Sequence, residues 1–373
     1  MWGVENKKIR VALIYGGVSG EHSISCATAG AVMEALDPQR YEIVPIAIQR
    51  DGTWVPGTDN PEELKLSHGL YEVDESDYRV VIPAGDGSQR PLKVSADAAK
   101  VELLQDVDVV FPLLHGPFGE DGTIQGLLEM ARIPYVGCGV FASAAGMDKH
   151  YMKIVLEAAG LPVGPYVAFT ATQWRTERDT LLGQIAELKY PLYVKPARAG
   201  SSLGITRIDS VAELDDAVAA AQEHDPKVVV EQGVAGREIE CAVLGGRGDE
   251  PARASVLGEV LLSAPESEFY DFEAKYLNPN GLEMSVPAQL DETVAQRVRD
   301  LAVRAFGAFG CEGMTRVDFF VSGEDIYIIE INTIPGFTPF SMYPVLWEHT
   351  GIPYSQLLDE LIWLALNRPV GLR

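Results

Sequence analysis

Short apolar runs alternate with amphipathic segments along the first third of the chain. The runs have the length and composition of buried strands, and the segments between them have the apolar spacing typical of helices. Strands are expected at 9–15, 41–48, 107–114 and 134–136, and helices at 23–36 and 122–131. This alternation predicts a Rossmann-like α/β domain over residues 1–145. The turn-rich, acidic stretch 51–104 does not fit the pattern.

The rest of the chain mixes strands and helices in a less regular α+β order. Helices are expected at 148–159, 177–188, 211–223, 291–309 and 354–367, and strands at 190–196, 205–208, 227–232, 237–244, 254–262, 314–321 and 326–332. The last two strands are joined by Ser322-Gly323-Glu324-Asp325, which is typical of a tight hairpin. We expect a central domain over 146–235 and a C-terminal domain over 236–373, with a long loop at 263–282.

Composition indicates a globular protein of several domains. A chain of 373 residues, 47% of them hydrophobic, is too long for a single ordinary core. The formal net charge is −24, from 30 basic and 54 acidic residues, which argues against binding to nucleic acid or to an anionic membrane. A polyanionic substrate would therefore have to be met by a few local cations and by metal ions.

The cysteines and the lengths of the apolar segments favour a cytoplasmic location. Cys26, Cys138, Cys241 and Cys311 are scattered, without a C-x-x-C pair or a Cys/His cluster, as expected for reduced thiols. The N-terminal apolar run is too short for a signal-peptide core, and no segment is long enough to span a membrane. We therefore expect a cytoplasmic protein without a membrane segment.

The strongest group of polar residues lies on the two strands of the predicted hairpin. Side chains alternate faces along a strand, so Arg316 and Asp318 share one face, and so do Glu330 and Asn332. If the strands pair in register, all four side chains point into one site. Carboxylate and amide oxygens suit Mg²⁺, and an adjacent arginine could stabilise developing negative charge. The alternative is an exposed polar face on an amphipathic hairpin.

A loop of small residues follows the predicted strand at 190–196. Lys195 lies near the end of this strand, and Ala199-Gly200-Ser201-Ser202-Leu203-Gly204 comes shortly after it. Small residues let backbone N–H groups approach a phosphate closely, and Lys195 would supply a charge. The spacing is not that of a P-loop. A surface hairpin with an incidental lysine is the alternative.

Two further loops follow strands of the predicted Rossmann-like domain. Residues 16–23 contain Glu21, and residues 115–122 begin with His115. Ligands bind at the carboxyl ends of strands in open α/β sheets, so both loops are candidates for a substrate site. Glu21 could hold a substrate ammonium group or simply cap the following helix.

The segment 269–276 within the long loop combines aromatic and charged residues. A loop of this length often acts as a lid over a site. Such a lid would turn Lys275 toward phosphates and use Tyr276 to exclude water. The alternative is a surface loop whose aromatic side chains pack into the core.

Taken together, these segments resemble the D-alanine–D-alanine ligases of the ATP-grasp superfamily. The matching stretches occur in family order and span nearly the whole chain: 16–25, 115–122, 147–149, 194–204, 230–231 with Glu238, 269–276, 315–318 and 330–342. The resemblance implies an ATP-grasp fold of three domains, with the Rossmann-like domain as the pre-ATP-grasp part. It also implies ATP-dependent ligation of two D-alanine molecules to D-alanyl-D-alanine through an acyl phosphate, for peptidoglycan synthesis.

The resemblance also assigns residues to ATP and to metal. ATP would lie between the central and C-terminal domains, with two Mg²⁺ ions or with Mn²⁺ as the alternative metal. The metal ligands would be Asp318, Glu330 and Asn332. The ATP contacts would be Lys149, Lys195, Ser202, Glu231, Gln232, Val234, Glu238 and Lys275. The protein would be a homodimer.

The two D-alanine molecules would bind beside the ATP phosphates. Glu21 would hold the first ammonium group and would join Ser201 and Tyr276 in a hydrogen-bonded set that links the three domains. Arg316 would stabilise the oxyanion of the reaction. The amino-acid contacts would be Glu21, His115, Tyr270, Gly336, Ser341 and Met342.

Other functions remain as alternatives at this stage. A ligase of the same fold could use D-lactate or D-serine as its second substrate, although the segment 270–276 favours D-alanine. A nucleotide-binding regulator would not need the lysines, arginine and metal carboxylates together. An NAD-dependent oxidoreductase would fit only the N-terminal part. The sequence departs from the family at Gln232, Phe272 and Phe340, where lysine, tyrosine and histidine are frequent.

Overall fold

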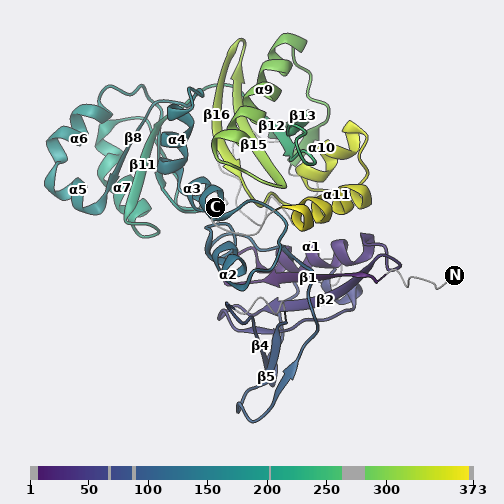
Figure 1. The fold of residues 1–373 in the computed structure, drawn as a ribbon. Helices are drawn as coiled ribbons and strands as arrows, with labels where there is room; N and C mark the ends of the chain where they lie inside the picture. Colours follow the sequence, from purple (N-terminus) through teal and green to yellow (C-terminus); the bar gives the residue numbers. More distant parts are fainter. Residues whose placement is uncertain (1–6, 66–68, 86–89, 201–202, 263–281, 369–373) are drawn as a thin grey trace.

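The computed structural model describes residues 7–65, 69–85, 90–200, 203–262 and 282–368 (Figure 1). Its N-terminal part is a four-stranded sheet in the order β3-β2-β1-β7. The strands are β1 (Ile9–Gly16), β2 (Tyr41–Ile48), β3 (Trp54–Pro56) and β7 (Val109–Pro112), with helices α1 (His22–Ala35) and α2 (Thr123–Ala131). β1 pairs in parallel with β2 and β7, which confirms the Rossmann-like prediction.

A small antiparallel sheet occupies part of the stretch that the sequence pattern left unordered. It projects below the N-terminal sheet in Figure 1 and has the order β4-β5-β6. Its strands are β4 (Tyr78–Val81), β5 (Leu92–Ser95) and β6 (Val101–Leu103), and a short 3₁₀ helix, η1 (Pro61–Leu64), precedes them. Strands of three or four residues are too short to show a clear alternation, so the sequence did not reveal them.

The central part is an antiparallel sheet in the order β10-β9-β11-β8 with helices beside it. The strands are β8 (Tyr166–Thr170), β9 (Leu192–Pro196), β10 (Thr206–Ile208) and β11 (Lys227–Gln232). The helices here and leading into this part are α3 (Val140–Met147), α4 (Lys149–Ala158), α5 (Ala171–Thr176), α6 (Arg178–Ile185) and α7 (Leu214–Gln222), the last preceded by η3 (Val211–Glu213). The helix expected at 177–188 is present as α6, whereas the sequence analysis missed α5, which a capping box at Thr170 starts and which ends where the chain leaves helical geometry at Glu177.

The C-terminal part is a five-stranded antiparallel sheet in the order β14-β13-β12-β15-β16. The strands are β12 (Arg237–Leu244), β13 (Arg253–Leu262), β14 (Leu282–Ser285), β15 (Met314–Ser322) and β16 (Asp325–Asn332). The helices are α9 (Glu292–Ala308), α10 (Met342–Thr350) and α11 (Tyr354–Asn367). The turn between Ser322 and Asp325 joins β15 and β16, as the sequence predicted.

The two faces of the C-terminal sheet belong to different hydrophobic cores. On one face, Ile239, Cys241 and Val243 pack with buried residues of α9. On the other face, Ala242 and Leu244 join a core that also includes α10, α11, α1 and the N-terminal sheet. The second core therefore brings the N-terminal sheet against the C-terminal sheet.

All four cysteines are buried and free of disulfide bonds. Among the described residues, no helix is both long and apolar enough to cross a membrane.

Candidate active site

The loops that follow β1 and β7 meet at the same edge of the N-terminal sheet, because the two strands are parallel neighbours. Ser25 on α1 ties them together. Its Oγ accepts a hydrogen bond from the Gly16 N–H at 2.8 Å and donates one to the Leu113 carbonyl at 2.6 Å. The loops also touch, since a Cβ added at Gly116 would lie 3.2 Å from the Ser19 Oγ.

Glu21 and His115, the two candidates on these loops, are thus carried to one edge. Glu21 occupies the N-cap position of α1, but its side chain makes no capping hydrogen bond. The structure therefore does not support the alternative that the Glu21 side chain caps α1. His115 is buried, three residues beyond the end of β7.

Glu120 is a further acidic residue that the sequence analysis did not single out. Its Oε2 accepts a hydrogen bond from the Gly116 N–H at 2.5 Å. Burial raises the pKa of Glu120 to about 8, and the charges of Glu21 and Glu330 raise it in the same direction. The N-terminal loops therefore lie within electrostatic reach of the β15–β16 hairpin. The sequence signal for Glu120 was its place within the 115–122 motif.

The hairpin has the register that a shared site requires, after a register shift between Asp318 and Phe319. Arg316 lies opposite Asn332, and Asp318 lies opposite Glu330, so the four side chains share one face. Arg316 binds Asp318 with two parallel hydrogen bonds, from Nε at 2.8 Å and from Nη2 at 2.7 Å. The Asn332 amide donates to Asp318 Oδ2 at 2.9 Å. The alternative of a merely exposed polar face is wrong, because Asp318 is only 2% exposed.

Glu240 on β12 is a third carboxylate beside this group. It lies opposite Asp318 across the β12–β15 pair, and its Oε2 is 3.0 Å from Arg316 Nε. Burial alone would lower the pKa of Arg316, but the charges of Asp318 and Glu240 outweigh it and hold the pKa above its usual value. The sequence offered one signal for Glu240, because it lies two residues after Glu238 on the same face of a strand.

The donor set of the hairpin fits a hard divalent cation. It consists of the Asp318 and Glu330 carboxylates and the Asn332 amide, which are oxygen ligands of the kind that Mg²⁺ uses. In the part of the chain that the structure describes, no three His, Cys, Asp or Glu side chains are arranged to hold a metal ion by themselves. Mg²⁺ commonly completes its coordination with substrate phosphates and water.

Two lysines expected at the phosphates converge near the glycine-rich loop. Lys149 begins α4, and its Nζ donates to the Ala199 carbonyl at 2.6 Å. Lys195 on β9 pairs with Glu231 Oε2 at 2.8 Å. Burial lowers the pKa of Lys149 and the charge of Lys195 lowers it further, whereas Glu330 raises it. Lys149 therefore lies within electrostatic reach of both Lys195 on β9 and Glu330 on β16.

Glu231 is held by two lysines. Its Oε1 is 3.4 Å from the Nζ of Lys153, a lysine that is only 2% exposed and that sequence reasoning missed. Burial alone would raise the pKa of Glu231, but the charges of Lys195 and Lys153 outweigh it and lower the pKa to about 2. The side chain of Glu231 thus orients Lys195.

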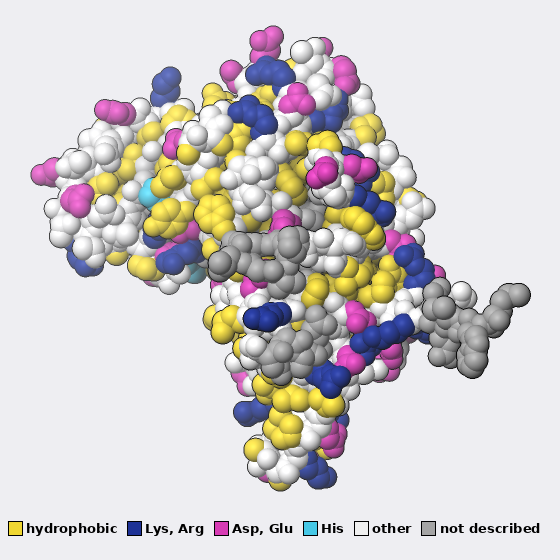
Figure 2. Space-filling model, viewed as in Figure 1, with side chains coloured by type: hydrophobic (Ala, Val, Ile, Leu, Met, Phe, Trp, Pro, Cys, Tyr) yellow, Lys and Arg dark blue, Asp and Glu magenta, His cyan; other side chains and the backbone are white. Residues whose placement is uncertain are grey.

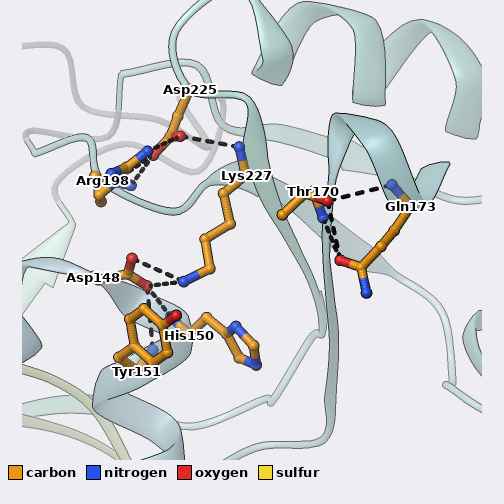
Figure 3. A network of polar contacts seen from close by, with 8 residues as sticks. All are labelled: Asp148, His150, Tyr151, Thr170, Gln173, Arg198, Asp225 and Lys227. Carbon is orange, nitrogen blue, oxygen red and sulfur yellow. Dashed lines mark hydrogen bonds and ion pairs between the residues drawn. The ribbon is translucent and has the colours of Figure 1, made fainter. Parts of the chain in front are cut away.

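A polar network fixes the root of the glycine-rich loop (Figure 3). Asp225 accepts hydrogen bonds from the backbone N–H, Nε and Nη2 of Arg198 at 2.9, 2.8 and 2.7 Å, and from the Lys227 N–H at 2.9 Å. Lys227 Nζ reaches both oxygens of Asp148 at 2.9 Å. Asp148 in turn caps α4, which begins with Lys149. The network therefore connects the loop to the helix that carries Lys149.

The remaining described candidates lie on or next to β11, β12 and α10. The Gln232 side chain accepts a hydrogen bond from the Lys189 N–H at 2.9 Å at the end of β11. Val234 follows in the connection to β12, and Glu238 shares the Glu240 face of β12. Gly336 lies between β16 and α10; Ser341 is the N-cap of α10, and Met342 is its first residue.

The sequence candidates Ser201, Ser202, Tyr270, Lys275 and Tyr276 lie outside the described residues. The loop 263–282 is described only from Leu282 onward, where β14 begins.

The fold and the hairpin define the chain as an ATP-grasp protein with a Rossmann-like N-terminal part. Comparison with known proteins identifies the family. The model of the D-ala D-ala ligase N-terminus matches residues 10–138, and that of the D-ala D-ala ligase C-terminus matches residues 155–363. The chain therefore belongs to the D-alanine–D-alanine ligase family, which confirms the resemblance drawn from its motifs.

Individual relatives cover nearly the whole chain. A D-alanine–D-alanine ligase from an Arthrobacter species is 53% identical over 368 residues, covering 98% of this chain and 96% of the relative. One from Kocuria rhizophila is 51% identical over 373 residues, covering 99% and 97%. Two solved structures are also similar. The VanG D-Ala:D-Ser ligase from Enterococcus faecalis has a TM-score of 0.83 and 36% identity, with 96% of this chain and 100% of that chain covered. The D-alanine–D-alanine ligase from Coxiella burnetii has a TM-score of 0.77 and 34% identity, with coverages of 97% and 94%.

Proposed function

We propose that this protein is an enzyme that joins two D-alanine molecules into D-alanyl-D-alanine for peptidoglycan synthesis, using ATP and releasing ADP and phosphate. The observation that carries the proposal is the shared face of Arg316, Asp318, Glu330 and Asn332, with Lys149 nearby. Relatives named D-alanine–D-alanine ligase, about half identical over the whole chain, support the same activity.

Activation of the first D-alanine is the first chemical problem. A carboxylate oxygen is a poor leaving group, so an amine does not displace it directly. Transfer of the γ-phosphoryl group to this carboxylate gives an acyl phosphate, whose phosphate leaves readily. We assign the phosphate contacts to Lys149, Lys195 and Lys275 and to the backbone around Ser202. Glu231, Gln232, Val234 and Glu238 would line the nucleoside.

Asp318, Glu330 and Asn332 would hold the metal, with two Mg²⁺ ions proposed and Mn²⁺ as the alternative. When bound, the metal would neutralise charge on the transferring phosphoryl group. Arg316 begins the step paired with Asp318 and Glu240, so it is held in place beside these ligands.

Peptide-bond formation is the second step. The amine of the second D-alanine attacks the acyl carbon, and Arg316 would stabilise the resulting oxyanion. Glu21 would hold the first ammonium group, with Ser201 and Tyr276 in the same hydrogen-bonded set and His115 and Tyr270 beside the amino acids. Gly336, Ser341 and Met342 would receive the second carboxylate. The segment 263–282 would exclude water, because water hydrolyses an acyl phosphate.

D-serine is the second candidate for the second substrate. The similarity to the VanG D-Ala:D-Ser ligase, with a TM-score of 0.83, is the observation that favours it. The relatives at about 50% identity carry the D-alanine–D-alanine name, so D-alanine remains the main proposal.

The test is ADP release coupled to product identification. The full chain is incubated with ATP, Mg²⁺ and D-alanine, and parallel reactions add D-serine, D-lactate or L-alanine. We expect one ADP per D-alanyl-D-alanine and no reaction with L-alanine. Preferential formation of D-alanyl-D-serine or of the D-lactate ester would show that D-serine or D-lactate, and not D-alanine, is the second substrate. ADP release without any ligated product would refute the ligase proposal.

We also propose that the enzyme works as a homodimer in the cytoplasm. Its other binding partners would be D-alanine and ATP, and it would bind neither nucleic acid nor membranes. Support comes from an apolar face on the β4–β5–β6 sheet, where Val81 and Leu103 lie on either side of Leu92. Figure 2 shows hydrophobic side chains over this projection. Large exposed apolar faces often mark contacts between proteins.

A charge placed on this face tests the dimer. Leu103→Glu should shift the protein toward monomers in sedimentation experiments, because burying an unpaired charge is costly. Val211→Glu is the matched control, since Val211 is 64% exposed and Leu103 is 62% exposed. An unchanged dimer in Leu103→Glu would exclude this face as the contact.

A further inference from the structure

Arg316 is shared between two buried carboxylates. Its Nε lies 2.8 Å from Asp318 Oδ1 and 3.0 Å from Glu240 Oε2, while its Nη2 binds Asp318 Oδ2 at 2.7 Å. Asp318 is 2% exposed and Glu240 is 5% exposed. Glu240, Asp318 and Glu330 lie opposite one another across β12, β15 and β16.

Asp318 has little capacity left for a metal ion in this arrangement. Its Oδ2 already accepts from Arg316 Nη2 and from the Asn332 amide, and its Oδ1 accepts from Arg316 Nε. The two carboxylate oxygens together offer about four lone-pair sites, and these donors fill three of them, including both on Oδ2. Metal binding through Oδ2, or through both oxygens of Asp318, therefore requires Arg316 to give up part of its pairing.

A buried arginine cannot lose its partner without a large cost. An unpaired buried charge destabilises the folded state more than a pair stabilises it. Glu240 offers the alternative partner, because it already contacts the same guanidinium nitrogen from the neighbouring strand. Arg316 can thus move its pairing from one carboxylate to the other while staying beside the site.

We propose that Glu240 is a positioning residue that holds Arg316 when Asp318 turns to the metal ion. The proposal rests on the roles assigned to Arg316 and Asp318 under the proposed function. Glu240 itself touches neither metal nor substrate in this scheme. It sets the metal affinity of the hairpin and keeps the arginine aligned for the oxyanion.

Metal affinity measured apart from turnover is the direct test. Mn²⁺ is titrated into the full chain with saturating ADP, and free Mn²⁺ is followed by electron paramagnetic resonance. Glu240→Gln should weaken Mn²⁺ binding by about tenfold, because Arg316 then remains on Asp318; changes in residues that orient metal ligands typically have effects of this size. Glu240→Asp, which keeps the charge, should restore most of the affinity.

Glu259 provides the matched control. It is also a nearly buried carboxylate on the same sheet, 8% exposed, and it pairs with Arg237 through two short contacts. It lies opposite Ile239, on the other face from Glu240. Glu259→Gln should leave Mn²⁺ binding unchanged. An equal loss in both variants would overturn the proposal, because it would indicate general damage to the sheet.

A double-mutant cycle separates positioning from simple charge attraction. If Glu240 acts through Arg316, the effect of Glu240→Gln should disappear in an Arg316→Met background. The same loss of Mn²⁺ affinity in both backgrounds would overturn the proposal, since it would mean that Glu240 merely attracts the cation through space.

The kinetic readout distinguishes failure of this proposal from failure of the proposed function. Glu240→Gln should raise the Mg²⁺ concentration for half-maximal ADP release and lower kcat, with the KM for D-alanine little changed. Changed Mn²⁺ binding without any dipeptide product would refute the ligase reaction and leave Glu240 in its role. Unchanged Mn²⁺ binding in an active ligase would refute Glu240 alone.

Discussion

Arg316 is a cation enclosed by acidic side chains, and its position explains why its loss should affect chemistry more than binding. It is paired with Asp318 and Glu240 on the face that carries the proposed metal ligands. Arg316→Ala should lower kcat by roughly 100-fold to 1,000-fold, as for removal of an oxyanion donor. The KM for ATP should change little, because Lys149 and Lys195 remain. Steady-state kinetics with varied ATP measure both quantities.

Arg297→Ala is the control for Arg316→Ala. Arg297 is exposed on α9, where it donates to the Glu324 carbonyl at 3.1 Å. Its loss should leave kcat unchanged. Normal turnover in Arg316→Ala would remove Arg316 from the mechanism.

Glu120 gives the unligated protein a specific pH dependence. Burial raises its pKa to about 8 from 4.5, so between these pH values the folded protein holds a proton that the unfolded chain has lost. The free energy of unfolding therefore falls as pH rises through this window. Glu120→Gln removes this proton, so its stability relative to the parent should be greater at pH 8 than at pH 5. Urea unfolding with a chelator present measures the difference.

The surface residue Glu187 supplies the comparison for Glu120. It is exposed after α6, so Glu187→Gln should shift stability equally at the two pH values. A pH-independent difference for Glu120→Gln would contradict a raised pKa in the folded protein.

At the scale of elements, the hairpin could be predicted because two local signals agree. The turn at 322–325 makes the two strands neighbours, and the side-chain alternation shows which residues of each strand share a face. The sequence therefore predicted that Arg316, Asp318, Glu330 and Asn332 would meet if the strands paired in register. The register shift between Asp318 and Phe319, which brings Asp318 opposite Glu330, had no signal in the sequence. The two loops of the N-terminal sheet followed in the same way from parallel strands ending at one edge.

Contacts between elements distant in the chain could not be predicted in this way. Glu240 pairs with Arg316 only because β12 lies beside β15, and no local pattern gives that strand order. Lys153 on α4 likewise contacts Glu231 on β11, and no local pattern shows that these two elements are neighbours. The roles of the residues within 263–281 remain predictions from the family resemblance, and so do the domain limits at 145 and 235.

The link between Asp225 and the glycine-rich loop leads to a prediction for ATP binding. Burial opposes ionisation of Asp225, but hydrogen bonds from Arg198 and Lys227 outweigh it and lower its pKa. Asp225→Asn removes the charge that fixes Arg198. A charge-assisted hydrogen bond contributes about 1.5–3 kcal/mol, so the Kd for ATP should rise by about tenfold or more. Calorimetric titration with ATP and Mg²⁺ measures the Kd.

The Arg207–Asp209 pair offers a control on the same sheet. Its atoms are 3.2 Å apart and both side chains are partly or largely exposed, so Asp209→Asn should leave the Kd unchanged. An unaltered Kd in Asp225→Asn would mean that the loop holds its phosphate-binding conformation without this network.

At the scale of the whole molecule, two cores differ in how far they extend along the chain. One is local, because its buried residues all lie between Phe169 and Val230 in the central part. The other joins β1, β7 and α1 to α10 and α11 at the far end of the sequence. The Tyr41 hydroxyl on β2 also donates a 2.6 Å hydrogen bond to Asp359 on α11, which adds a polar contact between the same two parts of the chain. The N-terminal sheet should therefore unfold together with the C-terminal helices, and the central part separately.

Two leucines test this division of cooperativity. Leu361 on α11 is fully buried in the extended core, and Leu214 on α7 is 1% exposed in the local core. Each substitution by alanine should cost about 2–5 kcal/mol in its own unit. Hydrogen exchange followed by mass spectrometry should show faster exchange in β1 and β7 for Leu361→Ala, with β9 and β11 unchanged. Leu214→Ala should show the reverse.

The reciprocal design makes the outcome decisive. Independent openings expose only the amides of the unit that a substitution weakens, because exchange reports the free energy of each local unfolding event. If both variants accelerated exchange equally in β1 and β9, the chain would unfold as one cooperative unit. The separation matters for function, because Lys195 lies on β9 in the local unit whereas Glu21 lies beside β1 in the extended one. Local unfolding of the central part would therefore displace Lys195 without disturbing the edge that carries Glu21.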